Sequence, residues 1–202
     1  DSIQNYAFGA CYSLKSVTIS SSVKGIGNST FRNCCFLKKD FVNNSSLDAE
    51  ENGYWGALVG ESEVDGLIIQ GTTVVGCRKN VTNVTIPNYI TNIGIHAFSY
   101  CSSLTSITIP YSVTSIGISA FSNCDSLTKT NYTGDIAGWC KIKFANGSAN
   151  PISNSHNLYI NDQEIQDLVI PNTVDSIQNN AFNACYSLKS VTISSSVKGI
   201  GN

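Results

Sequence analysis

Residues 86–127 read IPNYITNIGIHAFSYCSSLTSITIPYSVTSIGISAFSNCDSL, and within this stretch one pattern occurs twice. The first copy begins at Ile86 and the second at Ile109, 23 residues later. Both copies carry Ile-Pro, a β-branched residue, Ile-Gly, Ala-Phe, Cys and Leu in the same order and at the same spacing. A fixed period of this length assigns one small structural unit to each copy, and a single unit cannot bury its apolar side alone. The sequence therefore predicts a stack of repeats.

Each repeat changes its hydrophobic period as it proceeds. Ile107 and Ile109 alternate with Ser106 and Thr108, which is typical of a half-buried strand with both isoleucines facing inward. Ile93-Gly94 indicates a second short extended piece, in which the glycine permits a close approach of the backbone.

The remaining part of the repeat places Phe98, Cys101 and Leu104 three residues apart. Side chains at positions i and i+3 eclipse in a 3₁₀ turn, so a short 3₁₀ or single α turn would direct all three toward the core. The predicted fold is a leucine-rich-repeat solenoid, mainly β, with short strands, 3₁₀ or short helical turns and a 23-residue period. The predicted core residues are Phe8, Phe31, Phe98, Phe121, Phe182, Cys101, Cys124, Leu104, Leu127 and Leu188.

Two repeats are longer than the others. The positions equivalent to Ile109 are 19, 42, 86, 132, 170 and 193, so gaps of 44 and 38 residues follow positions 42 and 132. The first gap could hold one or two turns. Near position 42, Asp40 falls in an inward slot and Phe41 in an outward one, so the strand there either slips by one residue or bulges.

Hairpins are predicted in both expanded repeats. Residues 66–69 and 72–75 flank Gln70-Gly71, and residues 158–160 and 168–170 follow and precede the Asn161-Asp162 region as possible partners. Asp135 is predicted to cap a short helix that runs to Ile142, and residues 145–157 are predicted to form a polar loop.

A longer repeat is superimposed on the short one. Residues 175–202 repeat residues 1–28 at 26 of 28 positions, and the two differences are Tyr6/Asn180 and Gly9/Asn183. A unit of 174 residues has therefore been duplicated. We expect residues 1–202 to be a single solenoid domain, a fragment of a longer array of such units. Because neither end looks like a polar cap, we also expect end-to-end self-association.

Composition excludes several classes of function. Charged residues are 13% of the chain and the net charge is −2, so nothing indicates binding to nucleic acid. No apolar run approaches the roughly 18 residues of a membrane span. The eight cysteines are expected to be reduced thiols, since five share one packing slot, although disulfides between adjacent turns are conceivable. No metal or other cofactor is predicted, because Cys34 and Cys35 are adjacent and only His96 and His156 are available.

The repeat resembles the BspA-type leucine-rich repeat family of bacterial and protist surface proteins. Its pattern IP-x-x-V-T-x-IG-x-x-AF-x-x-C-x-x-L-x-x-V-x-IP is met almost throughout residues 86–127, and in part at 1–37 and 170–200. The resemblance covers nearly the whole chain. It implies a secreted or cell-surface location, and a non-enzymatic role in adhesion to a protein or glycan on a host or neighbouring cell.

The predicted binding surface is the open face of the strands. Its candidate residues are Ser16, Thr18, Asn83, Thr85, Ser106, Thr108, Asn131 with Thr133, Ser190 and Thr192, together with Tyr54 and Trp55 on the first expansion. The alternative is a structural spacer that displays other domains and binds nothing itself. Catalysis by Cys140 and His156 is disfavoured because no third orienting group is recognisable. A calcium loop at residues 61–66 is disfavoured because Thr72 stands where the closing Glu is required.

Overall fold

The computed structural model describes residues 1–201, which form two compact units. The first contains Asp1–Gly71 and Val75–Lys79, and the second contains Thr72–Val74 and the chain from Asn80 onward. Both are built mainly from short strands, as predicted. The expectation that residues 1–202 form one solenoid domain remains a prediction.

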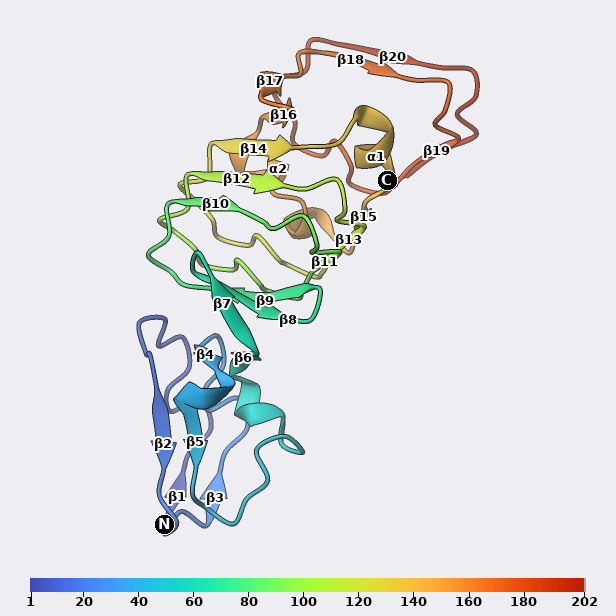
Figure 1. The fold of residues 1–202 in the computed structure, drawn as a ribbon. Helices are drawn as coiled ribbons and strands as arrows, with labels where there is room; N and C mark the ends of the chain where they lie inside the picture. Colours follow the sequence, from blue (N-terminus) through green and yellow to red (C-terminus); the bar gives the residue numbers. More distant parts are fainter. Residues whose placement is uncertain (202) are drawn as a thin grey trace. The chain divides into compact units, whose positions relative to one another are not determined.

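The first unit contains short strands and two 3₁₀ turns (Figure 1). In chain order these are β1 (Ser2–Ile3), β2 (Val17–Ile19), β3 (Gly25–Ile26), β4 (Cys35–Leu37), η1 (Lys38–Asp40), β5 (Phe41–Asn43), η2 (Gly53–Gly56), β6 (Leu58–Gly60), β7 (Ser62–Val64) and β8 (Leu67–Gln70). β9 (Thr73–Cys77) contributes residues to both units.

The second unit contains the regular repeats. Its strands are β10 (Asn83–Thr85), β11 (Asn92–Ile93), β12 (Ser106–Ile109), β13 (Ser115–Ile116), β14 (Lys129–Tyr132), β15 (Lys143–Phe144), β16 (Leu158–Ile160), β17 (Gln163–Glu164), β18 (Asp167–Ile170), β19 (Ser176–Ile177), β20 (Ser190–Ile193) and β21 (Gly199–Ile200). Its helices are α1 (Ile136–Lys141), η3 (Gly147–Ala149) and α2 (Ile152–Ser155).

The main ladder of the second unit follows the 23-residue period. β10, β12, β14 and β16 are parallel neighbours, and β12 pairs Ser106 with Lys129 of β14 (Figure 1). Along β12, Ile107 and Ile109 are buried while Ser106 and Thr108 remain partly exposed. The predicted inward and outward faces are confirmed.

A second ladder lies at the Ile-Gly position of each repeat. β11 pairs in parallel with Thr73–Val74 of β9 on one side and with β13 on the other, and β13 pairs with β15. A Cβ atom added to Gly117 would lie 2.6 Å from the Ile95 nitrogen, a distance at which one of them would have to shift. Glycine is therefore required there by the close approach of neighbouring turns, as predicted.

The third side of each repeat is a chain of tight turns and not a continuous 3₁₀ or α turn. The Cys101 amide donates to the Phe98 carbonyl at 3.0 Å, and the Leu104 amide donates to the Cys101 carbonyl at 3.0 Å. His96 and Tyr100 have left-handed backbones, with φ of 55° and 59°. Each left-handed residue redirects the chain after one turn, so no helix propagates. Phe98, Cys101 and Leu104 are nevertheless completely buried.

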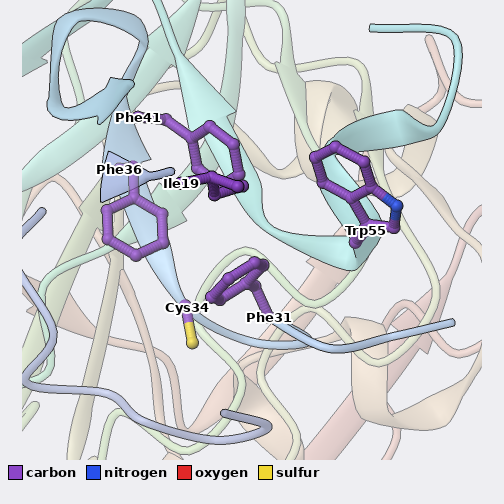
Figure 2. Close-up of a cluster of buried hydrophobic side chains, with 6 residues drawn as sticks. All are labelled: Ile19, Phe31, Cys34, Phe36, Phe41 and Trp55. Carbon is purple, nitrogen blue, oxygen red and sulfur yellow. The ribbon is translucent and has the colours of Figure 1, made fainter. Parts of the chain in front are cut away.

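The first unit has its own apolar core (Figure 2). It comprises the buried residues Ile19, Phe31, Cys34, Phe36, Phe41 and Trp55. β2 pairs with β5 so that Val17 lies opposite Phe41, and Ile19 lies opposite Asn43. The strand has therefore slipped by one residue relative to the 23-residue period, which places Phe41 inside and Val42 outside. No bulge is needed, because η1 absorbs the extra residue.

The first expanded repeat contains one hairpin more than predicted. β8 and β9 are neighbours on either side of Gly71, as expected. β7 also pairs antiparallel with β8 across Asp65-Gly66, both at positive φ, which is the geometry of a type I′ turn. The Asp-Gly signal was present in the sequence.

The second expanded repeat corrects two expectations. Asp135 caps α1 as predicted, since its carboxylate accepts a hydrogen bond from the Gly138 amide at 2.7 Å. The region 145–157 is not a polar loop, because it forms η3 and α2 and buries Asn150 and Ile152. The strand 158–160 forms its hairpin with β17, whereas β18 pairs in parallel with β20 of the next turn.

The expected core positions differ in burial along the chain. Phe31, Phe98, Phe121, Cys101, Cys124, Leu104 and Leu127 are buried, and Phe182 and Leu188 are half-buried. Phe8 is 42% exposed, so its expected place in the core is wrong. It stacks on Phe31 with ring centroids 5.4 Å apart, and that contact covers only one side of its ring. All eight cysteines lie in the described chain and are thiols there, not disulfides.

Candidate binding surface

The strand face of the second unit forms two rows of outward side chains. The ladder registers align Asn83, Ser106 and Lys129 in one row, and Thr85, Thr108, Asn131 and Tyr159 in the other. The expected pairing of Asn131 with Thr133 is wrong, because Lys129 occupies the first row and Thr133 follows the end of β14. We call these seven aligned residues the ladder face.

Hydrogen bonds between neighbouring turns fix the first row and its flank. Ser106 Oγ donates to Asn83 Oδ1 at 2.7 Å. Thr105 Oγ1 donates to the Thr82 carbonyl at 2.9 Å, and Thr128 Oγ1 donates to the Thr105 carbonyl at 3.3 Å. Side chains held in this way lose little further conformational freedom when they meet a partner, so this edge of the surface is pre-organised for binding.

The β16–β17 hairpin closes one end of the ladder face. Lys129 Nζ lies 2.7 Å from Asp162 Oδ1 and 5.0 Å from the centroid of the Tyr159 ring. The Asp162 amide donates to Asn131 Oδ1 at 2.9 Å, which leaves Asn131 only 4% exposed. Asn131 is therefore a structural residue and not an accessible binding residue. Lys129, Tyr159 and Asp162 present the polar chemistry there instead.

Two exposed tyrosines beside the ladder face were not predicted. Tyr89 follows β10 and Tyr111 follows β12, and Tyr111 is 66% exposed. The Tyr111 amide donates to Thr133 Oγ1 at 3.2 Å, which fixes the backbone at this corner. Tyrosine offers a large rigid contact area and is enriched in interface hot spots. The available sequence signal was an aromatic residue within two positions of each Ile-Pro pair.

The candidate residues of the first unit are distributed differently. Ser16 and Thr18 are exposed, and Thr18 pairs with the exposed Val42 on β5. Tyr54 is half-buried and its hydroxyl lies 3.2 Å from Glu50 Oε1; burial first, and then Glu50, raises its pKa. Trp55 is only 5% exposed and belongs to the core, so its expected role in contacting a partner is wrong.

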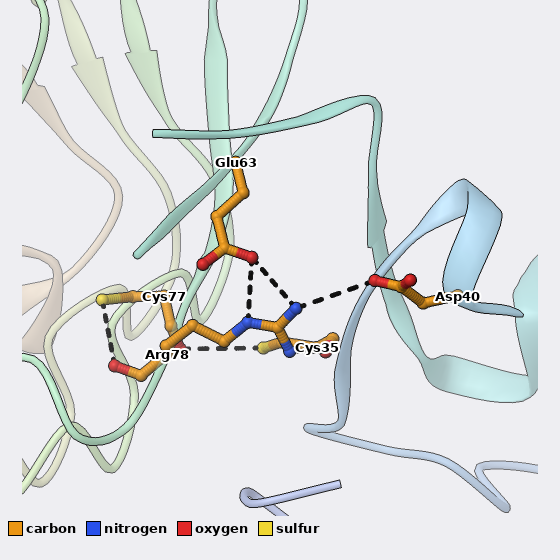
Figure 3. Close-up of polar contacts among 5 residues, drawn as sticks. All are labelled: Cys35, Asp40, Glu63, Cys77 and Arg78. Atoms are coloured by element: carbon orange, nitrogen blue, oxygen red, sulfur yellow. Dashed lines mark hydrogen bonds and ion pairs between the residues drawn. The ribbon is translucent and has the colours of Figure 1, made fainter. Parts of the chain in front are cut away.

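The acidic first expansion is partly neutralised from within its own unit (Figure 3). Arg78 Nη2 and Nε lie 3.1 and 3.2 Å from Glu63 Oε2, and Nη2 lies 4.0 Å from Asp40 Oδ2. Arg78 Nη1 donates to the Cys35 carbonyl at 2.6 Å. Glu63 is thus held in an ion pair, whereas the sequence indicated a fully solvated acidic loop. We call Arg78, Glu63, Asp40 and the Cys35 carbonyl the Arg78 cluster.

The geometry around Cys140 and His156 does not favour catalysis. Burial raises the pKa of the Cys140 thiol to about 11, and the nearby Asp135 raises it further, so the reactive thiolate is disfavoured. The His156 ring stacks on Tyr186 with centroids 4.4 Å apart. Within residues 1–201, no group of three or more His, Cys, Asp or Glu residues could hold a metal ion. In the same range, no helix has the length and apolar character needed to cross a bilayer.

Comparison with protein families identifies the repeat. A model described as the BspA type leucine rich repeat region matches this sequence in six copies, over residues 1–54, 69–162 and 153–202. These ranges leave out only residues 55–68 of the first expansion, which contain β6 and β7. No curated protein shows a significant match to the sequence.

Solved structures with some similarity are bacterial leucine-rich repeat proteins. A leucine-rich cell surface protein of Faecalibacterium prausnitzii is 18% identical, with a TM-score of 0.45 over 96% of this chain and 69% of its own. A leucine-rich repeat protein of Eubacterium ventriosum is 15% identical, with a TM-score of 0.41 over 100% of this chain and 78% of its own. The pneumococcal vaccine antigen PcpA is 18% identical, with a TM-score of 0.41 over 100% of this chain and 45% of its own.

Proposed function

Because the chain belongs to the BspA-type leucine-rich repeat family, we propose that it is a non-enzymatic adhesion module that binds a protein on a host or neighbouring cell through the ladder face. Repeats of this family form a protein-interaction module, and an extended solenoid face suits a large partner. The printed name of the Faecalibacterium prausnitzii protein places that protein at the cell surface, and we propose the same location here.

The observation that carries this proposal is the order of the ladder face. Its inward side chains, such as Ile107 and Ile109, are completely buried, which makes the strands a rigid support. Its outward hydroxyl and amide groups can both donate and accept hydrogen bonds. Lys129 and Asp162 add opposite charges at one end, and Tyr111 adds an aromatic surface at the corner. A mixed surface of this kind matches the polar rim and aromatic anchors of protein interfaces.

Substitution within the ladder face tests the proposal. Thr85→Arg and Thr108→Arg place a long charged side chain on the face without removing a buried group, because Thr85 is exposed and Thr108 is half-exposed. The unmodified chain and both variants are assayed against immobilised extracellular matrix proteins and intact host cells. We expect the unmodified chain to be retained and both variants to lose at least about tenfold in affinity, which corresponds to 1.4 kcal/mol.

Ser126→Arg is the matched control, since Ser126 is an exposed turn residue outside the ladder face. It should bind as the unmodified chain does. Equal losses for all three variants would show that added charge, and not the ladder face, controls binding. Retention on glycan arrays but not on proteins would replace the protein partner with a glycan. Absence of any retained partner would favour the spacer function instead.

A further inference from the structure

The two near-identical segments of the chain adopt the same conformation. β1 pairs with β3 in the register Ser2 to Gly25, and β19 pairs with β21 in the register Ser176 to Gly199. Each pair of residues in the second segment lies 174 positions after its counterpart. The left-handed residues also correspond, since Tyr6 has φ of 58° and Asn180 has φ of 61°. We call residues 1–28 the N-terminal copy and residues 175–201 the C-terminal copy.

The surroundings of the two copies differ. Ile19 is 2% exposed, whereas its counterpart Ile193 is 47% exposed. In the N-terminal copy, Ile19 is covered by the core cluster that residues 31–55 supply (Figure 2). β5 adds a strand to β2, and the Phe8 amide donates to the Thr30 carbonyl at 2.9 Å. We call residues 29–59 the covering segment.

The corresponding side of the C-terminal copy is open and apolar. A hollow of about 320 Å³ lies there, lined in part by Leu188, Val191, Ile193 and Ile200. Their counterparts all contact the core cluster of the first unit. These counterparts are Leu14, Val17, Ile19 and Ile26. The open face thus presents the same residues, in the same backbone conformation, that the covering segment already binds within one molecule.

We propose that the C-terminal copy of one molecule docks on the covering segment of a second molecule and displaces the N-terminal copy of that second molecule. The contact is heterologous, because each molecule supplies a C-terminal copy at one site and a covering segment at the other. It can therefore repeat head to tail as an open chain.

The exchange is favoured by what it covers. Before it, the C-terminal copy exposes Val191 and Ile193 on one molecule, and the N-terminal copy exposes the ring of Phe8 on the other. After it, the C-terminal copy is packed on both sides, and the displaced segment regains conformational freedom. The interface is otherwise conserved because 26 of 28 positions are identical. At one difference the incoming copy is the better one, since Asn180 tolerates a left-handed backbone more readily than Tyr6.

Two substitutions in the full 202-residue chain test the exchange. Ile193→Asp places a charge on the docking face of the C-terminal copy, where the side chain is already half exposed. Ile19→Asp weakens the resident N-terminal copy and leaves the incoming copy intact. Molar mass is measured by size-exclusion chromatography with light scattering, after incubation across a concentration series.

We expect the unmodified chain to form dimers and larger species slowly, Ile19→Asp to form them at lower concentration, and Ile193→Asp to remain monomeric. The double variant Ile19→Asp/Ile193→Asp should also be monomeric. Simple stacking of intact ends predicts the opposite for Ile19→Asp, because a distorted first turn would stack less well. Association of the double variant would indicate aggregation of an unfolded unit and would overturn the proposal, as would a monomeric Ile19→Asp.

Hydrogen exchange of the unmodified chain gives a second, independent reading. Peptides that contain Tyr6 or Asn180 have different masses, so the two copies can be followed separately. In the isolated oligomer, amides of the N-terminal copy should lose protection while those of the C-terminal copy gain it. An oligomer in which the N-terminal copy keeps its protection would show that no displacement occurs.

Discussion

The Cys124 thiol donates a hydrogen bond to the Phe98 carbonyl oxygen, 3.0 Å away in the preceding turn. The same relationship joins Cys34 to Phe8, at 3.1 Å. The Phe98 carbonyl also accepts from the Cys101 amide, so Cys124 supplies its second hydrogen bond. Cysteine thus serves this slot as a small apolar residue that can also donate to the neighbouring turn, and size alone does not explain it.

Replacing Cys124 separates these two roles. Cys124→Ala removes the donor and leaves a small cavity, so it should cost about 1–2 kcal/mol of unfolding free energy. Cys124→Ser keeps a donor of similar size and should cost less than Cys124→Ala. Urea denaturation of both variants gives the two values. A serine variant that is less stable than the alanine variant would show that apolar packing alone determines the slot.

Stability should decrease in alkaline solution because buried thiols resist ionisation. Burial raises the pKa of Cys34 and of Cys140 to about 11 from an ordinary value of 9.0. Below pH 9 both the folded and unfolded states hold these protons, and the full stability is present. Between pH 9 and pH 11 the unfolded chain loses its protons first, so the free energy of unfolding falls as pH rises through this range.

The measurement is the urea midpoint as a function of pH for the unmodified chain and for Cys140→Ser. Removal of one titrating thiol should make the decline shallower between pH 9 and pH 11, while Tyr132, whose pKa burial and Asp135 raise to about 12, remains to titrate in both proteins. Identical slopes would mean that Cys140 is not protected from solvent in the folded state.

Sequence periodicity predicted the parts of the fold that repeat. The inward faces of Ile107 and Ile109 and the glycine corner at Gly117 follow from spacing, because each residue contacts its counterpart one turn away. The choice of partner for β16 could not be predicted in this way. Both β17 and residues 168–170 are strand-like, and only the stacking of the next turn assigns β18 to β20.

The details of the candidate binding surface were predicted less completely. Repeat spacing identified Thr85 and Thr108, but Asn131 is covered by a hairpin that departs from the repeat. Arg78 joins residues that are 15 and 43 positions away, and no local pattern connects them. Residues in inserted segments are therefore the ones whose surroundings the period does not predict.

The Arg78 cluster should stabilise the first unit through geometry as well as charge. Arg78→Lys keeps the charge, but a single amine cannot reach both Glu63 and the Cys35 carbonyl, so we expect a loss of about 1–2 kcal/mol. Lys38→Met is the matched control, because the Lys38–Glu50 pair is exposed and spans 3.7 Å, and its loss should stay within about 0.5 kcal/mol. Amide exchange within residues 1–71 measures both. A lysine variant as stable as the unmodified chain would show that charge alone suffices.

The phenylalanine slot gives the final test of the stacked core. Phe121 is completely buried and stacks on Phe98 with ring centroids 4.9 Å apart, so Phe121→Ala should cost roughly 3–5 kcal/mol. Phe182 occupies the same slot but is half-buried, and its replacement by alanine should cost clearly less. Thr108→Ala on the ladder face should change stability by no more than about 0.5 kcal/mol. Guanidinium denaturation of the three variants gives the order. Comparable losses for Phe121→Ala and Thr108→Ala would mean that the inner and outer faces of the repeat have been assigned the wrong way round.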